Sequence, residues 1–186
     1  MKLKLTFLSV VGLALMSSNA LAAEALASIK ATTEGSLVSG GVHLTEKGEG
    51  LEIIVQVVNV SPGKHGFHIH ENGSCEEMGK AAGGHYNPDQ VQHGLITRDG
   101  FTNAHCGDFG NIDVGPDGTG TVTLFVPGLT LTGEKYNVAG KAVILHEKED
   151  DFGQPTGNAG GRIGCGIIEI MPKTIKAMPI MPGAKE

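Results

Sequence analysis

The sequence predicts an all-β fold, a sandwich or barrel of short antiparallel strands with two long functional loops. Short runs alternate apolar and polar residues with the period of a strand, and no stretch keeps the period of a helix. The 29 glycines are more than twice the average share, which is typical of many turns between short strands. The 186 residues suffice for a single domain with a full core.

The first 22 residues stand apart from this domain. Lys2 and Lys4 open the chain, an apolar segment runs from Leu5 to Met16, and Ala20-Leu21-Ala22 has the small-x-small form of a cleavage site. This order is typical of a secretory signal peptide, and the segment is too short to span a bilayer; a buried core helix is the alternative. We therefore expect an exported protein, periplasmic or secreted, without a membrane span.

The strand-like runs follow one another along the rest of the chain, and the clearest one shows a single apolar face. In LEIIVQVVNV (51–60), every second side chain from Leu51 to Val57 is apolar, while Glu52 and Gln56 face the other way. The other runs are HGFHIH (65–70), TVTLFV (121–126), KAVILH (141–146), CGIIEI (165–170) and two strands within residues 25–45 around Glu34-Gly35.

Two long segments between these runs, roughly 71–118 and 147–164, are dense in Gly, Asn, Asp and His. Loops of this length in a compact domain usually carry function. The predicted domain spans residues 23–170. Residues 171–186 contain three prolines and no pattern, so we expect a disordered tail. Its methionines are soft groups that could contact Cu(I), which is the alternative interpretation.

Charge and cysteine content narrow the class of protein further. Removing residues 1–22 takes away two of the 14 basic residues and none of the 20 acidic ones, which leaves a formal charge of −8. Such a chain is a poor candidate for binding nucleic acid, because that affinity depends on basic groups that neutralise phosphates. An oxidising compartment permits disulfides, and three cysteines allow one bridge and leave one thiol over.

Histidines concentrate around the first long loop. His68 and His70 lie two residues apart in a predicted strand, so their side chains project from the same face, although an isolated His-x-His pair often has no function. Further along, GHYNPDQVQH and HCGD supply three nitrogens and a carboxylate, which suit tetrahedral zinc. His146 closes a later strand, and with His68 and His70 it forms an all-nitrogen set that suits Cu(II).

Five blocks of the chain together resemble the copper,zinc superoxide dismutases, and in particular the bacterial exported kind. The blocks are GFHIHENGSC, GGHYNP, HCGDFGN, VILHEKEDDFG and TGNAGGRIGCGII, and the likeness runs from about residue 27 to residue 170. The resemblance implies a Greek-key β-sandwich or barrel of about eight antiparallel strands. It also implies an enzyme that converts superoxide to dioxygen and hydrogen peroxide by alternating reduction and reoxidation of a copper ion, beside a histidine-bridged structural zinc.

The resemblance further implies two sets of metal ligands that share one imidazole. The copper ligands are His68, His70, His85 and His146. The zinc ligands are His85, His93, His105 and Asp108. His85 belongs to both sets because the family uses one deprotonated imidazole as a bridge. On reduction this imidazole is expected to leave the copper, take up a proton and hand it to the product.

Other positions match the family outside the two ligand sets. Asp150 matches the carboxylate that links His68 to His93 and so fixes the orientation and basicity of both rings. Arg162 matches the active-site arginine, which would pair with the anionic substrate, and Thr156 matches the residue at the mouth of the channel. The disulfide of the family falls on Cys75 and Cys165.

Two features depart from the family pattern, and two histidines stay outside the sites. His93 and His105 lie twelve residues apart, longer than is usual, so we expect the loop to bulge between them. Cys106 has no counterpart and as a thiolate could compete for zinc, but the HxGD frame favours His105. We expect His43 to be a surface residue and His65 a structural one.

The acidic loop after His146 and the net charge both oppose the approach of an anion. We therefore expect Arg162, helped by Lys148, Lys80 or Arg98, to make a local positive funnel. The expected partners are superoxide as substrate and, at most, a second copy of the chain, as monomer or homodimer. The alternatives to this enzyme are a non-enzymatic copper carrier or chaperone on the same fold and a zinc-stabilised adhesion module.

Overall fold

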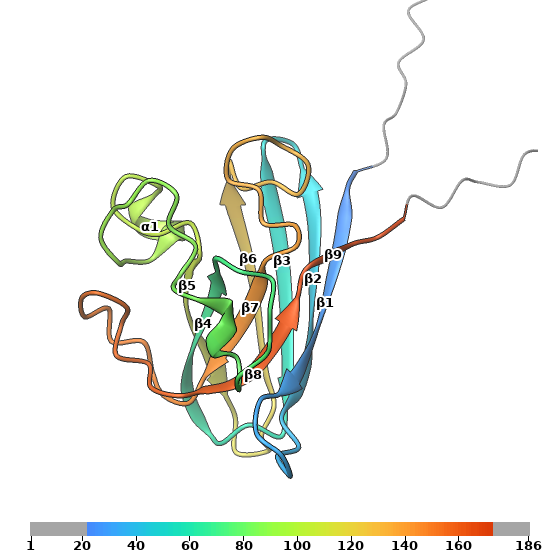
Figure 1. Cartoon of the computed structure of the whole chain (residues 1–186), viewed down its shortest axis with the longest axis vertical. Helices are drawn as coiled ribbons and strands as arrows, with labels where there is room; N and C mark the ends of the chain where they lie inside the picture. The colour runs from blue at the N-terminus through green and yellow to red at the C-terminus, as the bar shows by residue number, and fades with distance from the viewer. Residues whose placement is uncertain (1–21, 173–186) are drawn as a thin grey trace, which may run out of the picture.

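Within residues 22–172, the part of the chain that the computed structural model describes, eight antiparallel strands close a barrel (Figure 1). The strands are β1 (Glu24–Ala31), β2 (Ser39–Lys47), β3 (Gly50–Val58), β4 (Gly63–His70), β5 (Asp108–Val114), β6 (Gly120–Pro127), β7 (Ala142–His146) and β8 (Arg162–Ile167). A two-residue strand, β9 (Glu169–Ile170), pairs with β1, and two short helices, η1 (Lys80–Ala82) and α1 (Ile96–Asp99), lie in the loop after β4.

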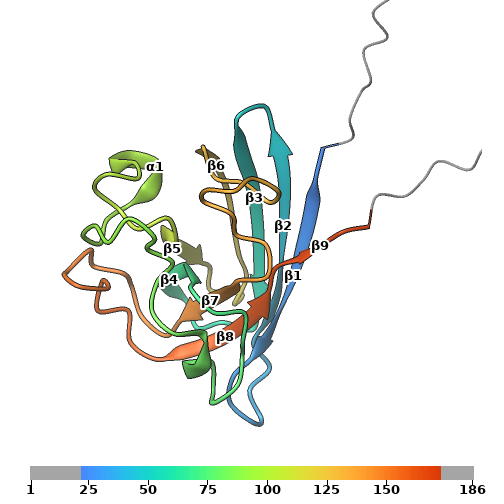
Figure 2. The ribbon, with the colours of Figure 1, turned by 45° about the horizontal axis from the view of Figure 1, so that its top comes forward.

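The strand order confirms the predicted Greek-key barrel. The strands are hydrogen-bonded in the order β2-β3-β6-β5-β4-β7-β8-β1, and the pairing of β1 with β2 closes the ring. Strands β4, β5 and β6 follow one another as neighbours, and β7 returns to lie beside β4, which is the Greek-key connection. Figure 2 shows the closed ring from a second direction, with the two long loops on one side of it.

The strands could be predicted because apolar and polar side chains alternate along them, as the inner and outer faces of the barrel wall require. On β3 the side chains of Leu51, Ile53 and Val55 are buried, whereas Gln56 is exposed. On β7 every residue is buried, because the inward side chains join the barrel core while Ala142 and Ile144 pack outward under the loop after β4. A strand buried on both faces has no alternation to show.

The first long loop is shorter than predicted, since residues 71–118 include a strand. Strand β5 (Asp108–Val114) pairs with β4 and is largely buried, yet its residues DFGNIDV are mostly turn formers. The loop therefore ends at residue 107, and the second loop runs over 147–161, because β8 begins at Arg162. The expected bulge between His93 and His105 is present and contains α1.

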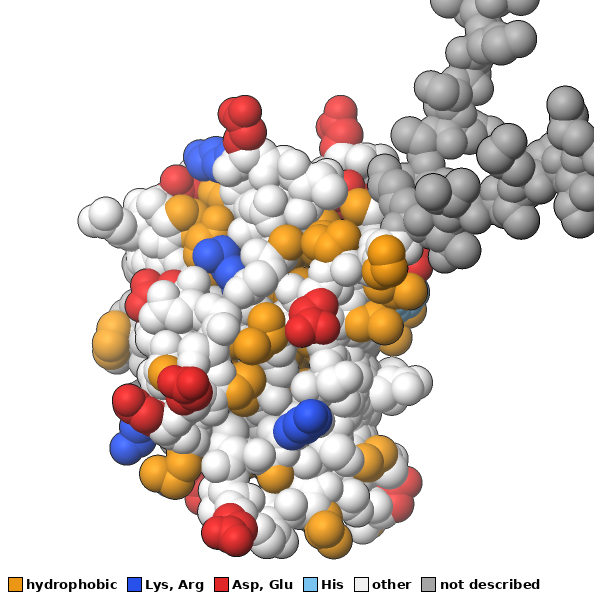
Figure 3. All heavy atoms as spheres, turned by 45° about the vertical axis from the view of Figure 1, so that its right-hand side comes forward, with side chains coloured by type: hydrophobic (Ala, Val, Ile, Leu, Met, Phe, Trp, Pro, Cys, Tyr) orange, Lys and Arg blue, Asp and Glu red, His pale blue; other side chains and the backbone are white. Residues whose placement is uncertain are grey.

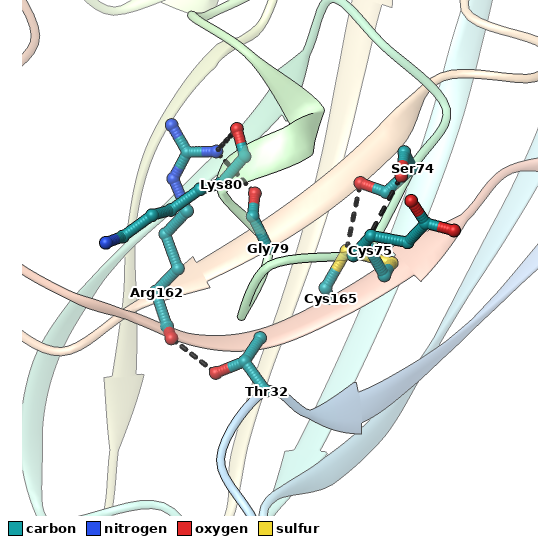
Figure 4. Close-up of a disulfide and its surroundings, with 8 residues drawn as sticks. Thr32, Ser74, Cys75, Gly79, Lys80, Arg162 and Cys165 are labelled. Atoms are coloured by element: carbon teal, nitrogen blue, oxygen red, sulfur yellow. Dashed lines mark hydrogen bonds between the residues drawn. A yellow bond between two sulfur atoms is a disulfide. The ribbon is translucent and has the colours of Figure 1, made fainter.

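A disulfide ties the first loop to the last long strand, as the resemblance implied. Cys75 and Cys165 are bonded, with their Cα atoms 5.7 Å apart and 90 residues between them. Closing a loop of this length stabilises the fold by about 4–5 kcal/mol on the chain-entropy model. Figure 4 shows the bridge near Arg162 and Gly79, so the same covalent link also restrains the loop that contains Gly79.

The ends of the described chain lie together on one face of the barrel. Figure 3 shows apolar side chains gathered beside the residues drawn in grey, and Leu26, Ile170 and Met171 are the exposed large apolar residues of β1, β9 and the segment after it. Met171 lies in the predicted tail, but its amide N–H donates to the carbonyl of Glu24, so pairing with β1 extends to this residue.

Both terminal predictions fall largely outside the described residues. Residues 1–21 of the expected signal peptide (1–22) and residues 173–186 of the expected tail, with Met178 and Met181, are not described. In the described range, no helix has the length and apolar character needed to cross a membrane.

Candidate metal centre

Seven buried side chains converge on the outside of the barrel wall, under the two long loops. They form two groups in which the potential ligand atoms lie within 4.8 Å of one another. The first group, called here the copper-side cluster, comprises His68, His70, His85 and His146. The second, called here the zinc-side cluster, comprises His85, His93, His105 and Asp108. The sequence-predicted sets are therefore brought together in space, with His85 common to both.

The strands position three members of the copper-side cluster. Phe67 and Ile69 of β4 point into the barrel core, so the alternate residues His68 and His70 point outward. β7 lies beside β4, with Ile144 opposite His68, and it carries His146 at its end. The ring centroids of His68 and His146 are 4.9 Å apart, which gives these three imidazoles one common focus.

Each of these three rings is held at one nitrogen and has no partner at the other. His70 Nδ1 lies 2.9 Å from the carbonyl of Gly83, and His68 Nε2 lies 2.8 Å from Asp150. The other nitrogens, His68 Nδ1, His70 Nε2 and His146 Nε2, are buried without a hydrogen-bond partner. Because buried polar atoms are almost always paired, three unpaired nitrogens aimed at one point fit a metal ion held by nitrogen ligands.

Asp108 organises the zinc-side cluster at the start of β5. Its Oδ1 lies 2.8 Å from His85 Nδ1 and 3.1 Å from His105 Nδ1, and its Oδ2 lies 2.9 Å from His93 Nδ1. The backbone N–H groups of Gly94 and His105 also donate to Oδ2, at 2.9 Å each, and fix the carboxylate. Three imidazole nitrogens around one carboxylate are the donor set that structural zinc prefers.

His85 connects the two clusters through its two nitrogens. Its Nδ1 faces Asp108 and lies 3.4 Å from His105 Nδ1, so its Nε2 is left for the copper-side cluster. The centroid of its ring lies 4.1 Å from that of His68 and 5.2 Å from that of His93. An imidazole in this place could contact one ion with each nitrogen.

Asp150 links the clusters a second time, from the loop after β7. Its Oδ2 lies 2.8 Å from His68 Nε2, and its Oδ1 lies 2.9 Å from His93 Nε2. A Cβ on Gly157 would stand 1.9 Å from Asp150 Oδ1, so only glycine permits this approach. The side chain of Asn111 bonds the backbone of Asp150 on both sides, at 2.7 and 2.9 Å.

The copper-side histidines and His93 of the zinc side have pKa values shifted in opposite directions. On the copper side, burial together with the neighbouring histidines lowers the pKa of His70 to about 2 and that of His146 to about 3. On the zinc side, burial also lowers the pKa of His93, but Asp108 and Asp150 outweigh it and raise the value to about 9. For shared His85, burial lowers the pKa to about 4 despite the bond with Asp108.

A pocket of about 360 Å³ opens onto the copper-side cluster alone. Its walls are His70, Gly84, His85, His146, Thr156, Asn158, Ala159, Gly160 and Arg162. The zinc-side ligands His93, His105 and Asp108 are absent from these walls and buried. A closed site suits a structural ion and an open one suits a reactive ion, so the pocket distinguishes the copper side from the zinc side.

The loop that carries the disulfide holds Arg162 at the pocket. Its Nη1 donates to the carbonyl of Gly79 at 2.5 Å and its Nη2 to that of Gly83 at 2.6 Å. The carbonyl of Gly83 also faces His70 Nδ1, so the arginine and a copper-side ligand share one anchor. Figure 4 shows the guanidinium against this loop, and Thr32 on the carbonyl of Arg162.

The structure also places the residues that the sequence left uncertain. His43 is half exposed on β2 beside Glu24, and belongs to neither group. Cys106 is buried in the barrel core, where burial raises the pKa of its thiol to about 12, so the thiolate that was the alternative to His105 as a zinc ligand is disfavoured. Arg98, expected to help steer substrate, is paired with Asp99 on α1 and is not among the pocket walls.

Two further side chains position the ligands: His65, which was expected from the sequence to be structural, and Gln154, which was not singled out there. His65 is buried, with Nδ1 2.8 Å from the carbonyl of His146 and Nε2 2.8 Å from that of Ser61, so it orders the chain at a copper-side ligand. The side-chain amide of Gln154 bonds both backbone groups of His93, at 2.9 and 3.0 Å. Only the position of His65 in the HGFHIH block hinted at such a role.

Comparisons with known proteins agree with this geometry. Residues 38–168 match the family described as Copper/zinc superoxide dismutase (SODC). The chain is 40% identical over 147 residues to an extracellular Cu-Zn superoxide dismutase of Drosophila melanogaster, covering 74% of this chain and 79% of that protein. It is also 40% identical over 139 residues to Cu-Zn superoxide dismutase 2 of Brassica juncea, covering 70% of this chain and 89% of the relative.

A solved structure gives the same result for the fold. The clock protein EA4 superposes with a TM-score of 0.72 at 30% sequence identity, covering 84% of this chain and all of that one.

Proposed function

The chain belongs to the copper/zinc superoxide dismutase family, and we propose that it converts superoxide to dioxygen and hydrogen peroxide at the copper-side cluster. The observation that carries the proposal is the pairing of three unpartnered, buried imidazole nitrogens with an open pocket that also contains a guanidinium. A site that only stores an ion needs neither the pocket nor the arginine.

The two donor sets suit two different ions. His68 Nδ1, His70 Nε2, His146 Nε2 and the Nε2 of His85 would hold copper, and His85 Nδ1, His93, His105 and Asp108 would hold zinc. Copper supplies a reversible one-electron couple, whereas zinc keeps its oxidation state and supplies a fixed charge.

Arg162 would bind and orient the anionic substrate. Two of its nitrogens are held by backbone carbonyls, so the guanidinium is fixed in the pocket wall, and no carboxylate of residues 22–172 forms an ion pair with it. A fixed cation stabilises the negative charge of superoxide on arrival and the greater charge that develops during reduction. Thr156 and Gly160 narrow the pocket around it.

His85 would hold and deliver a proton at Nε2. Asp108 fixes Nδ1 of His85 from the zinc side, so the other nitrogen of this ring, Nε2, is the one that faces the pocket. A proton held at this nitrogen would face the pocket, where a reduced product could accept it. Asp150 keeps His68 and His93 oriented, so both neighbours of His85 stay in place during the transfer.

We propose that the protein is exported, either to a periplasm or out of the cell. Three observations support export: the expected signal peptide over residues 1–22, the disulfide, and the similarity to a fly protein named as extracellular. We also propose that the protein is of the bacterial exported type. Its partners would be superoxide as substrate and, at most, a second copy of the chain. Sedimentation of the purified protein would distinguish a monomer from a homodimer.

Selective removal of copper tests the function. The purified mature protein should contain one copper and one zinc per chain, and its superoxide-dependent production of peroxide should disappear when copper alone is removed and return when it is restored. Activity that persists without copper would contradict the proposal. A protein that binds copper stoichiometrically but makes no peroxide would instead be the copper carrier.

A further inference from the structure

We propose that Tyr136, far from both metal clusters, is a positioning residue that clamps the zinc-bearing loop and slows the release of zinc. The inference rests on the zinc site proposed above, and names a part of this chain that acts on it. Residues 85–108, called here the ligand loop, carry all four zinc-side ligands. Tyr136 belongs to the β6–β7 loop, residues 128–141.

The β6–β7 loop is a rigid platform. Leu129, Leu131 and Val138 are buried in the barrel core, with exposed fractions of 2% or less. The carboxylate of Glu46 on β2 accepts the backbone N–H groups of Leu131 and Thr132, at 2.7 and 3.0 Å. A segment with this many buried anchors opens rarely, so it can hold a more mobile neighbour.

Tyr136 contacts the ligand loop on both sides of His93. Its hydroxyl donates to Asp89 Oδ2 at 2.5 Å, which holds the segment between His85 and His93. Its ring stacks on Phe101 with centroids 3.9 Å apart and planes 4° from parallel, which holds the bulge between His93 and His105. Lys135 adds to the first contact, with Nζ 3.4 Å from Asp89 Oδ1.

The conformation of Tyr136 supports a dedicated role. Its φ of 55° lies in the left-handed region, which is unfavourable for an aromatic residue. Such a conformation persists only where contacts of the side chain or backbone enforce it, and it is often found where geometry serves function. In Figure 1 the β6–β7 loop lies above the barrel beside the α1 bulge, and the stacked rings join the two.

The clamp acts on the outer part of the ligand loop, whereas Gln154 already bonds the backbone of His93 at its inner side. Asp89 and its neighbour Gln90 are exposed, and the bulge reaches the core mainly through Ile96 and Ala104. Holding the segments before and after His93 lowers the freedom that His93 gains when zinc leaves. Ligands that are pre-positioned in this way lose metal more slowly.

Zinc release by the fully metallated mature protein tests the inference. Tyr136→Phe removes the hydroxyl and keeps the stack, whereas Phe101→Leu removes the stack and keeps the hydroxyl. Each should release zinc to a chromogenic chelator roughly three- to ten-fold faster, the factor that corresponds to one ordinary hydrogen bond or aromatic pair. Phe125→Leu, at an exposed aromatic on the outside of β6, should keep the wild-type rate.

Copper release, measured on the same samples, separates positioning from general destabilisation. If the clamp acts on the ligand loop, copper should leave all variants at the wild-type rate. Wild-type zinc release in both variants would overturn the inference, and so would an equal acceleration of zinc and copper together with a lower melting temperature. A wild-type protein that takes up no zinc would instead overturn the zinc site itself.

Discussion

The copper-side and zinc-side clusters are built mainly from the same residue type, yet they differ in two respects. The zinc side contains Asp108, whose carboxylate faces three imidazoles, and the copper side contains no carboxylate. The zinc side is closed, whereas the copper side forms the wall of a pocket. In the zinc-side cluster a carboxylate of the protein therefore balances the positive charge of the site, whereas the copper-side cluster leaves room for an anion from the solvent.

This difference explains how one metal centre can combine stability with reactivity. A buried cation is costly unless negative groups compensate it, and Asp108 supplies that compensation in the zinc-side cluster. The copper-side cluster has no carboxylate among its four members, although Asp150 bonds the outer nitrogen of His68, so a small anion could add compensation transiently beside Arg162. His85 transmits the rigidity of the closed side to the open one, because the zinc side fixes its Nδ1.

Removing a ligand from the open side should give the largest effect. His146→Ala deletes one of the three copper-side nitrogens that have no hydrogen-bond partner. We expect catalysis to fall more than about 100-fold, above the loss typical for a group that only orients a ligand, while zinc stays near one equivalent per chain. Metal analysis and a superoxide assay on the same sample measure both.

His43→Ala is the matched control for this experiment, because His43 lies on the surface outside both clusters. It should retain copper, zinc and activity. Loss of zinc in His146→Ala comparable to the loss of copper would mean that the two clusters are not separable, and would contradict the comparison.

Removing the charge that draws the anion should have the next largest effect. Arg162→Ala leaves both ligand sets intact but deletes the cation in the pocket wall. We expect kcat/KM to fall roughly 10- to 100-fold, and Arg162→Lys to recover part of the loss, because a lysine restores charge without the fork of donors.

Arg98→Ala serves as the control for the arginine experiment, since Arg98 is paired with Asp99 on α1. It should leave kcat/KM unchanged. An equal loss in Arg98→Ala and Arg162→Ala would show that overall charge, and not the pocket, controls the rate.

The sequence predicted the strands and ligands unevenly, for physical reasons. β3 was predictable because Leu51 to Val57 alternate along one exposed and one buried face. β5 was not, because Gly110 and Asn111 are turn formers that β4 holds in a strand through pairing. Local patterns describe a strand only where its two faces differ.

The residues alone predicted a histidine metal site, but the sharing of His85 between two ions was predictable only through the likeness to a family. His68 and His146 are far apart in sequence, and their approach depends on the pairing of β4 with β7. No local spacing encodes that pairing, whereas HIH is visible as a pair. The contacts made by His65 and Gln154 could not be predicted, because each depends on a backbone group of another segment.

In the metal-free protein, the contributions of the copper-side and zinc-side histidines to folding stability should change with pH in opposite directions. His70, His85 and His146 have folded pKa values lowered to about 2, 4 and 3, so the unfolded chain binds their protons first. Their contribution to stability is complete above pH 6.5 and is lost as the pH falls from 6.5 toward 4. Each histidine adds a slope of up to about 1.4 kcal/mol per pH unit.

His93 should have the reverse effect. Its folded pKa is raised to about 9 by Asp108 and Asp150, so its contribution is complete below pH 6.5 and is lost as the pH rises through 9. The free energy of unfolding, measured by denaturant titration of the metal-free protein, should therefore be greatest near pH 6.5.

Two substitutions assign these slopes to the two clusters. His70→Asn should flatten the acid side of the stability profile only, and His93→Asn the alkaline side only. A profile without slope between pH 4.5 and 6.5 would contradict the uncharged state of the copper-side histidines. The carboxylates Asp108 and Asp150 have lowered pKa values and act below pH 4, outside this window.

The rim of the pocket should give the smallest effect, through two adjacent charges of opposite sign. A Cβ on Gly160, in the pocket wall, would meet Lys148 Cδ at 3.2 Å and Glu147 Oε2 at 3.4 Å, so both side chains lie over this wall. We expect Lys148→Gln to lower kcat/KM about two-fold at low salt and Glu147→Gln to raise it about two-fold. Both differences should vanish at high ionic strength, since exposed charges are screened.

If the wild-type rate instead rises as salt is added, the net field at the rim repels superoxide, and Arg162 acts only after the anion has entered.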